Sequence, residues 1–306
     1  MKDTFYGDTR SHRIGFAAIV MACLAGTVTT AMAAKGGVLG DQLVPEEMLF
    51  VRSACVAAAA YAIALGKVYP VNWKIFWAGL LLGLSSICFF RALQAWRVNP
   101  VVVMLTLVPA VNIAISFLDG HKPSKTVILS AACLILGCAI SVAPSNGSFS
   151  LSGLAWSIAC ILTSAWGFDL WGKCPESTTV SEKCFWYGVS ATILAGISVY
   201  SLGLPLSPIK FAAIPAVTLL LFCGMSVLYM YASIIPFDKL GKMDTARAST
   251  LLYSSTPISI LGAWLINHEE MALWRLPGVA LATLGAIWLT KETLGKNFTH
   301  LAVKAT

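Results

Sequence analysis

Long apolar runs alternate with short polar stretches along almost the whole chain. A helix needs about 20 apolar residues to cross the hydrocarbon core of a bilayer, and by that measure the sequence predicts ten membrane-spanning helices. Their ranges are 14–34, 46–65, 73–93, 99–118, 125–142, 151–172, 184–203, 211–234, 246–266 and 273–290. The connections between these runs are short, so we expect an all-α integral membrane protein without a soluble domain.

The first apolar run also has features of a secretory signal peptide. Arg10 and Arg13 precede it, and Ala31-Met32-Ala33 is similar to a signal-peptidase site. Its apolar core of about 20 residues is longer than the roughly 7–15 residues of a cleaved signal. We therefore predict that this run is retained as the first helix.

Two pairs of special residues recur at the same spacing. A displacement of 148 residues takes Pro109 onto Pro257 and Gly137 onto Gly285. Each proline falls inside an apolar run, where it frees a backbone carbonyl and kinks the helix. We expect both prolines to be kinks at which the molecule pivots.

The recurrence predicts an internal duplication with five helices in each copy. The first repeat is residues 1–145, and the second is residues 146–306 with a short cytoplasmic tail. Because five is an odd number, the second copy must enter the bilayer from the opposite face. Inverted repeats of this kind enclose a pathway at their interface in secondary transporters.

Composition and charge agree with a bilayer environment. Hydrophobic residues make up 58% of the chain and charged residues 11%, and the mean hydropathy is +0.78. Of the 21 Lys and Arg residues, 15 fall on the side that holds both termini and five on the other. The positive-inside rule therefore predicts a multi-pass protein of the cytoplasmic (inner) membrane with cytoplasmic N- and C-termini. The net charge of +7 follows from this bias and indicates no nucleic-acid partner.

Polar and aromatic side chains inside the apolar runs mark a candidate substrate pathway. The candidates are Arg52, Asn112, Ser116, Trp166, Tyr229, Tyr253 and Thr256. Structural interpretations stay open, because an intramembrane asparagine often joins two helices and hydroxyl groups can satisfy one another. Trp171 lies near a helix end, where an aromatic belt explains it.

Two charged residues inside the predicted helices each allow two interpretations. Arg52 either reaches outward or pairs with Glu47, or it is a cavity charge that meets an anionic group of the solute. Asp169 is a candidate for proton coupling, but Lys173 lies four residues further on and can neutralise it.

No motif indicates a cofactor, a metal site or an enzyme. The nine cysteines show no CxxC or Cys/His metal spacing. The stretch 167–173 fits GxxxxGK but ends an apolar helix with no strand before it, so it is not a phosphate-binding loop. The four histidines fall at helix ends or in tails, without a catalytic partner at a defined spacing.

The chain resembles the EamA-type branch of the drug/metabolite transporter superfamily, and the similarity covers nearly its whole length. The motif that carries it is Pro257, Glu269-Glu270, Gly278 and Gly285. In that family the second repeat shows a proline, an acidic residue at the outer corner and two glycines seven apart. The first repeat departs from the pattern, because His121-Lys122 stands where an acidic residue is usual.

The resemblance implies a carrier with a central cavity. We therefore predict a secondary transporter, not an enzyme, that moves an amino acid, a nucleoside-like or a similar amphipathic metabolite across the cytoplasmic membrane by alternating access. It would act as an exporter or exchanger. Its expected partners are the small-molecule substrate and the lipid bilayer, and a homodimer is left open. The alternatives are an integral-membrane enzyme acting on a lipid-like substrate and a non-transporting membrane scaffold.

Overall fold

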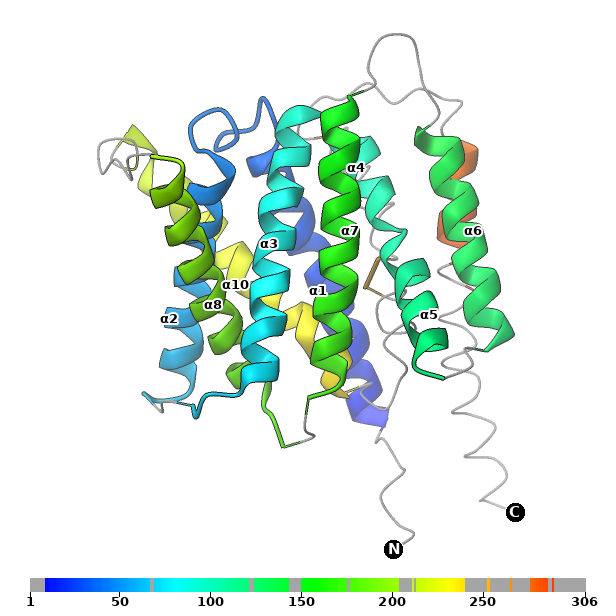
Figure 1. Ribbon diagram of the computed structural model, residues 1–306, viewed down its shortest axis with the longest axis horizontal. Helices are drawn as coiled ribbons and strands as arrows, with labels where there is room; N and C mark the ends of the chain where they lie inside the picture. Colours follow the sequence, from blue (N-terminus) through cyan, green and yellow to red (C-terminus); the bar gives the residue numbers. More distant parts are fainter. Residues whose placement is uncertain are drawn as a thin grey trace, which may run out of the picture.

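All the regular structure in the described part of the chain is helical. The computed structural model describes residues 9–66, 69–120, 124–142, 150–174, 177–203, 211, 213–239, 252–253, 265, 276–285 and 288, and no strand occurs among them. Figure 1 shows the helices side by side, with their axes roughly parallel. The predicted all-α fold class is confirmed for these residues.

The helices follow the predicted apolar runs closely. Their bounds are α1 (Thr9–Ala33), α2 (Pro45–Ile63), α3 (Trp73–Ala95), α4 (Val98–Leu105), α5 (Val108–Leu118), α6 (Lys125–Val142), α7 (Leu151–Gly172), α8 (Val180–Ser201) and α10 (Ala216–Lys239). A further apolar helix covers Leu276–Gly285. The predicted run 246–266 lies almost entirely outside the described residues.

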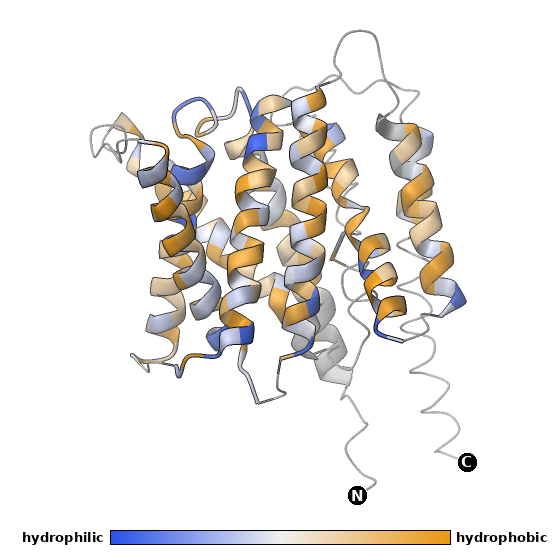
Figure 2. Cartoon of the chain, viewed as in Figure 1, coloured by the Kyte–Doolittle hydropathy of each residue, from blue (hydrophilic) through white to orange (hydrophobic). Residues whose placement is uncertain are grey.

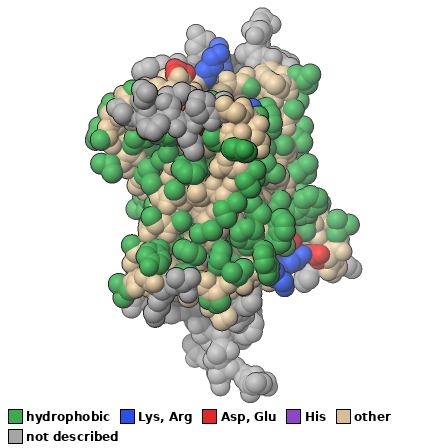
Figure 3. Space-filling model, turned by 60° about the vertical axis from the view of Figure 1, so that its left-hand side comes forward, with side chains coloured by type: hydrophobic (Ala, Val, Ile, Leu, Met, Phe, Trp, Pro, Cys, Tyr) green, Lys and Arg blue, Asp and Glu red, His purple; other side chains and the backbone are tan. Residues whose placement is uncertain are grey.

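Five stretches of the described chain are long and apolar enough to cross a membrane. They are Trp73–Ala95, Val98–Leu118, Leu151–Gly172, Val180–Ser201 and Ala216–Ile235. Hydrophobic residues predominate along the helices, and hydrophilic ones gather at the helix ends (Figure 2). On the face shown in Figure 3, the Lys, Arg, Asp and Glu side chains lie near the two ends, and large hydrophobic side chains cover the middle. An apolar belt between two polar ends is the surface that a membrane protein presents to lipid.

The span Val98–Leu118 is divided into α4 and α5 at the residues before Pro109. Pro109 has no N–H, so the carbonyl of Leu105 loses its helical donor. The chain tightens there: the N–H of Thr106 donates to the carbonyl of Val103 at 3.1 Å, and that of Leu107 donates to Met104 at 3.0 Å. Two short helices thus replace one continuous helix.

Three helix pairs dominate the interhelical packing. α3 packs along α7, α2 along α8, and α1 along α10, and Figure 1 shows α3 and α7 adjacent along their length. Each pair joins a helix from residues 1–145 to one from residues 146–306. The two parts of the chain are therefore interleaved and share one core.

The buried core lies along these helix pairs. One cluster includes Leu49, Trp171 and Tyr187, and a second includes Phe90 and Phe222. All five side chains are fully buried. Because lipid tails are as apolar as these side chains, close packing holds such a bundle together more than the hydrophobic effect does.

α6 and the helix 276–285 approach so closely that their backbones touch. A Cβ added to Gly137 would lie 2.6 Å from the carbonyl oxygen of Gly278, and one added to Gly285 would lie 2.9 Å from that of Ser130. The later residue of each helix thus faces the earlier residue of the other, so the two helices run antiparallel. Only residues without a side chain fit at these two crossing points.

Candidate functional site

A cavity of about 120 Å³ lies inside the helix bundle. Its walls come from α1, α2, α3, α4, α7, α8 and α10, together with Tyr253. Six serine and threonine residues line it: Thr29, Thr30, Ser85, Ser86, Ser164 and Ser233. Six aromatic residues do so too: Phe89, Phe168, Trp171, Tyr187, Tyr229 and Tyr253. An engineered cavity of about 150 Å³ holds benzene, so this one suits a molecule of similar size.

Small residues of α1 make room for the aromatic wall. A Cβ added to Gly26 would lie 3.1 Å from the ring of Tyr229 on α10. The tyrosine ring therefore lies directly against the backbone of α1. It also supports the next residue of the site, because the guanidinium carbon of Arg52 lies 5.2 Å from the centre of that ring.

Arg52 enters the cavity from α2 and is only 5% exposed. Its guanidinium carbon also lies 5.9 Å from the ring centre of Phe90, and its Nη2 contacts the sulphur of Met230 at 3.6 Å. The Nε has no hydrogen-bond partner. No ion pair or hydrogen bond joins Arg52 to a carboxylate within the described part of the chain.

These contacts supply no negative charge to balance the guanidinium. A desolvated cation–π contact is worth about 2 kcal/mol, and thioether sulphur is a weak acceptor. Removing a guanidinium from water costs several kcal/mol. Of the two interpretations of Arg52, the structure favours the cavity charge: the side chain stays inside, and Glu47 Oε2 accepts instead from the N–H of Val44 at 3.1 Å.

Trp171 adds a second unpartnered donor to the cavity wall. It is 1% exposed, and its Nε1 has no hydrogen-bond partner in the part of the chain that the structure describes. Its ring packs against Phe168 and Tyr187, with centroids 6.0 Å and 6.4 Å apart. The aromatic-belt interpretation does not fit Trp171, because its side chain is buried against Phe168 and Tyr187.

The structure brings together three of the predicted pathway residues, Arg52, Tyr229 and Tyr253, which all line the cavity. Trp166 is 58% exposed on the outside of α7 and takes no part in the lining. Thr256 and Pro257 lie outside the described residues.

Asn112 and Ser116 are buried on α5, away from the cavity lining. Neither polar atom of the Asn112 amide has a hydrogen-bond partner among the described residues. The described helices therefore form no interhelical hydrogen bond with Asn112, and Asn112 is not among the residues that line the cavity. Pro109, on the same helix, lies just after the break between α4 and α5.

Asp169 belongs to an ion cluster at one end of the bundle. Lys173 Nζ lies 2.8 Å from Asp169 and 2.6 Å from Asp119. The hydrogen bond to Asp119, and then the one to Asp169, raise the pKa of Lys173 above its ordinary value. Asp169 does not line the cavity, and its part in proton coupling stays a prediction. The cluster joins the end of α5 to the end of α7.

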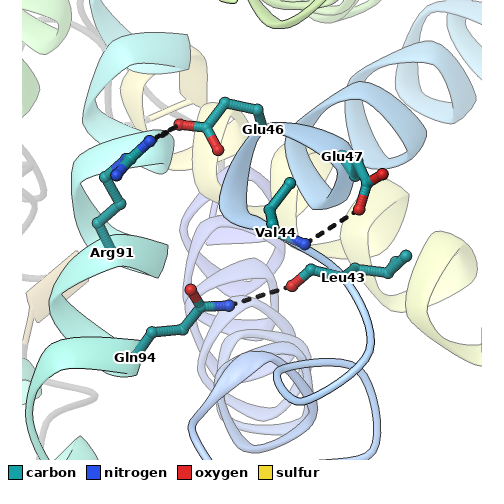
Figure 4. Close-up of polar contacts among 6 residues, drawn as sticks. All are labelled: Leu43, Val44, Glu46, Glu47, Arg91 and Gln94. Atoms are coloured by element: carbon teal, nitrogen blue, oxygen red, sulfur yellow. Dashed lines mark hydrogen bonds and ion pairs between the residues drawn. The ribbon is translucent and has the colours of Figure 1, made fainter. Parts of the chain in front are cut away.

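The opposite end of the bundle carries a second polar network, which Figure 4 shows. Arg91, near the end of α3, donates through Nε to Glu46 at the start of α2 over 2.9 Å. Gln94, one turn further along, donates to the carbonyl of Leu43 at 3.1 Å. The guanidinium of Arg91 also lies 5.2 Å from the ring centre of Trp156 on α7. Sequence reasoning missed this network because no motif or regular spacing links its members.

No cluster that could hold a metal ion occurs in the part of the chain that the structure describes. No protein-family model matches the chain, and no curated protein matches it. One solved structure, described only as "Crystal structure of protein", superposes with a TM-score of 0.69 over 93% of this chain and 97% of its own, at 15% sequence identity. At this identity the likeness shows a shared fold and nothing about function.

Proposed function

We propose that this protein is a secondary transporter that moves a small metabolite across the cytoplasmic membrane by alternating access. The observation that carries the proposal is the cavity itself, which helices from both parts of the chain enclose within a bundle of membrane-spanning length. A solute site between two halves of a bundle is the arrangement on which alternating-access carriers depend. The EamA-type motif in the sequence supports the same assignment.

The proposed architecture is ten helices in two inverted five-helix repeats. The contact between α6 and the helix 276–285 supports it. A displacement of 148 residues takes Ser130 onto Gly278 and Gly137 onto Gly285. Exchanging the two copies therefore turns the contact between Gly137 and Gly278 into the contact between Gly285 and Ser130. Both contacts are present. A contact that maps onto itself when two copies are exchanged is what a two-fold axis would produce, and the antiparallel helices agree with a proposed axis in the membrane plane.

The main helix pairs follow the same exchange. In the proposed repeat α7 is the second copy of α1, α8 of α2, and α10 of α3. Exchanging the copies turns the α3–α7 pair into the α10–α1 pair and leaves the α2–α8 pair unchanged. These are the three pairs that dominate the packing.

We propose that the Lys173 cluster acts as a gate, because it joins charged side chains of both proposed repeats, whereas Glu46 and Arg91 belong to the same one. On the charge distribution of the sequence, the Lys173 cluster lies at the cytoplasmic end and the Glu46–Arg91 pair at the outer end. Lys173 and Asp119 belong to different repeats, so separating the repeats at that end must break their ion pair. Rocking of one repeat against the other would then expose the cavity to one side at a time.

Counterflow in proteoliposomes tests the proposal. Vesicles containing the purified protein are loaded with a mixture of unlabelled amino acids, nucleosides and organic acids, and each labelled compound is then added outside. We expect at least one label to accumulate transiently and saturably, without chemical change. Absence of counterflow for every compound would contradict a carrier, and conversion of the label would favour a membrane enzyme.

A further inference from the structure

The cavity wall is cationic. Arg52 carries the only formal charge among the described residues that line the cavity. It is 5% exposed and has no carboxylate partner in the described chain. A buried charge is tolerated where a partner of opposite sign arrives. The missing partner is therefore an anion.

The wall also has unused donors. Among the described residues, Arg52 Nε and Trp171 Nε1 have no hydrogen-bond partner, and both side chains line the cavity. Arginine and tryptophan can only donate hydrogen bonds and cannot accept them. Two elements far apart in the sequence, α2 and α7, thus both lack an acceptor at the same cavity. A ligand with hydrogen-bond acceptors would pair with these donors.

The size and lining narrow the ligand further. A cavity of about 120 Å³ suits a molecule close to benzene in size. The aromatic side chains, among them Phe89, Phe168 and Tyr187, offer an apolar surface to its body. A single guanidinium balances a single negative charge, and its planar fork matches the two oxygens of a carboxylate.

We infer that the cavity binds a small organic monoanion, a carboxylate with a short apolar or aromatic body, as the substrate of the proposed transporter. The carboxylate takes the donors of Arg52, the body lies against the aromatic wall, and Trp171 offers a further donor on that wall. Arg52 repels a cation. A neutral sugar leaves the charge of Arg52 unbalanced, and a dianion brings more negative charge than Arg52 neutralises. That the bound anion is a substrate rests on the proposed function, but its binding can be measured without transport.

The test is thermal unfolding of the full chain in detergent with pairs of acids and their neutral amides. The pairs are acetate and acetamide, lactate and lactamide, and benzoate and benzamide; every acid is ionised at pH 7. A compound that binds the folded protein raises its Tm with concentration. We expect at least one acid to do so clearly more than its amide.

Variants of the protein test whether the acid that raises the Tm binds in the cavity. Arg52→Gln should weaken binding of that acid about tenfold or more, and Trp171→Phe, which keeps the ring but loses the N–H, about threefold to tenfold. Arg97→Gln is the matched control, because Arg97 is exposed at the start of α4. It should bind the acid as the unmodified protein does.

Several results would overturn the inference. If the acids raise the Tm of the unmodified protein no more than their amides do, the inference is wrong. This result does not depend on whether Arg52→Gln folds. Equal dose curves for Arg52→Gln and the unmodified protein would also overturn the inference, and an unchanged Trp171→Phe would remove Trp171 from the site. Inorganic sulphate or phosphate acting as well as the best acid would show a simple anion site, and stabilisation by phosphatidylglycerol alone would show a lipid site.

Failure of this inference is distinguishable from failure of the proposed function. An acid that binds through Arg52 but shows no counterflow would leave the anion site standing and contradict the carrier. Counterflow of neutral compounds, without binding of any acid, would leave the carrier standing and contradict the anion site.

Discussion

Among single residues, Arg52 is the one whose buried charge costs stability and is also suited to bind a ligand. Its charge is buried beside Tyr229 and Phe90 with no countercharge in the described chain. Binding sites often hold such groups at a cost in stability, because the unpaired group is what the ligand recognises. The same charge should therefore lower the stability of the empty protein.

We predict that Arg52→Met raises the Tm of the protein without added solute. The methionine keeps apolar volume next to Tyr229 and removes the unpaired charge, which should stabilise the fold by about 1 kcal/mol or more. Thermal unfolding in detergent measures this. Arg97→Met, at an exposed position, should leave the Tm nearly unchanged. A marked fall in Tm for Arg52→Met would mean that the resting protein already compensates the charge.

Lys173 gives a pH-dependent prediction. Its pKa is raised in the folded state by Asp119 and Asp169, so its contribution to stability is complete below the unfolded pKa of about 10.4. That contribution is lost only as the pH rises through the higher folded pKa. Lys173→Met should thus lower the Tm by a small and constant amount, about one or two degrees, between pH 6 and 9.

The difference between Lys173→Met and the unmodified protein should shrink as the pH rises above the unfolded pKa of about 10.4 and through the higher folded pKa, because the unmodified lysine then loses its charge. Unfolding curves from pH 6 to 11.5 measure it. A difference that grows with pH would contradict the ion cluster.

Among the secondary-structure elements, the crossing of α6 with the helix 276–285 depends on two glycines. Gly137 and Gly285 each leave less than 3 Å between an added Cβ and a backbone atom of the other helix. Backbone atoms cannot turn aside as a flexible side chain can. The two helices would have to move apart to admit even one methyl group.

We predict that Gly137→Ala and Gly285→Ala each destabilise the protein by about 1–3 kcal/mol. The two costs should be similar if the proposed repeat holds, because it would make the two contacts equivalent. Gly224→Ala is the matched control: an added Cβ there meets nothing within 4 Å, so alanine should be neutral or stabilising by up to about 1 kcal/mol. Tm values in one detergent compare all three. Very unequal costs at Gly137 and Gly285 would count against the symmetric crossing.

For the whole molecule, the decisive property is whether water reaches the cavity from both sides of the membrane. Ser86 and Leu84 lie two residues apart on α3, and only Ser86 lines the cavity. Leu84 is 39% exposed on the outside of the bundle. The two positions therefore compare a cavity-lining residue with an outward-facing one on the same helix.

We predict that Ser86→Cys, in a background without the nine native cysteines, reacts with a membrane-impermeant thiol reagent from either side of the membrane. A thiol reacts as the thiolate, which needs water, so Leu84→Cys should stay unreactive. Labelling of right-side-out and inside-out vesicles measures both. If Ser86→Cys reacts from one side only, the cavity does not alternate. If it reacts from neither side, the proposed pathway is closed to water.

The sequence by itself determined the helices and their environment. Hydropathy over about 20 residues is a local property that the thickness of a bilayer converts directly into a span. The break before Pro109 followed from the missing N–H of proline, and the ion pair of Asp169 with Lys173 followed from their spacing of four residues on one helix. These features depend only on near neighbours along the chain.

Only the tertiary structure decided which face of each helix looks inward. In a soluble protein the apolar face of a helix marks the core, but the lipid-facing side of a membrane helix is as apolar as the packed side. The sequence pattern therefore could not tell which of Trp166 and Trp171, on the same helix, faces inward. Trp166 is 58% exposed, and Trp171 is 1% exposed. The same ambiguity hid the network of Glu46 with Arg91, and packing between distant helices resolved it.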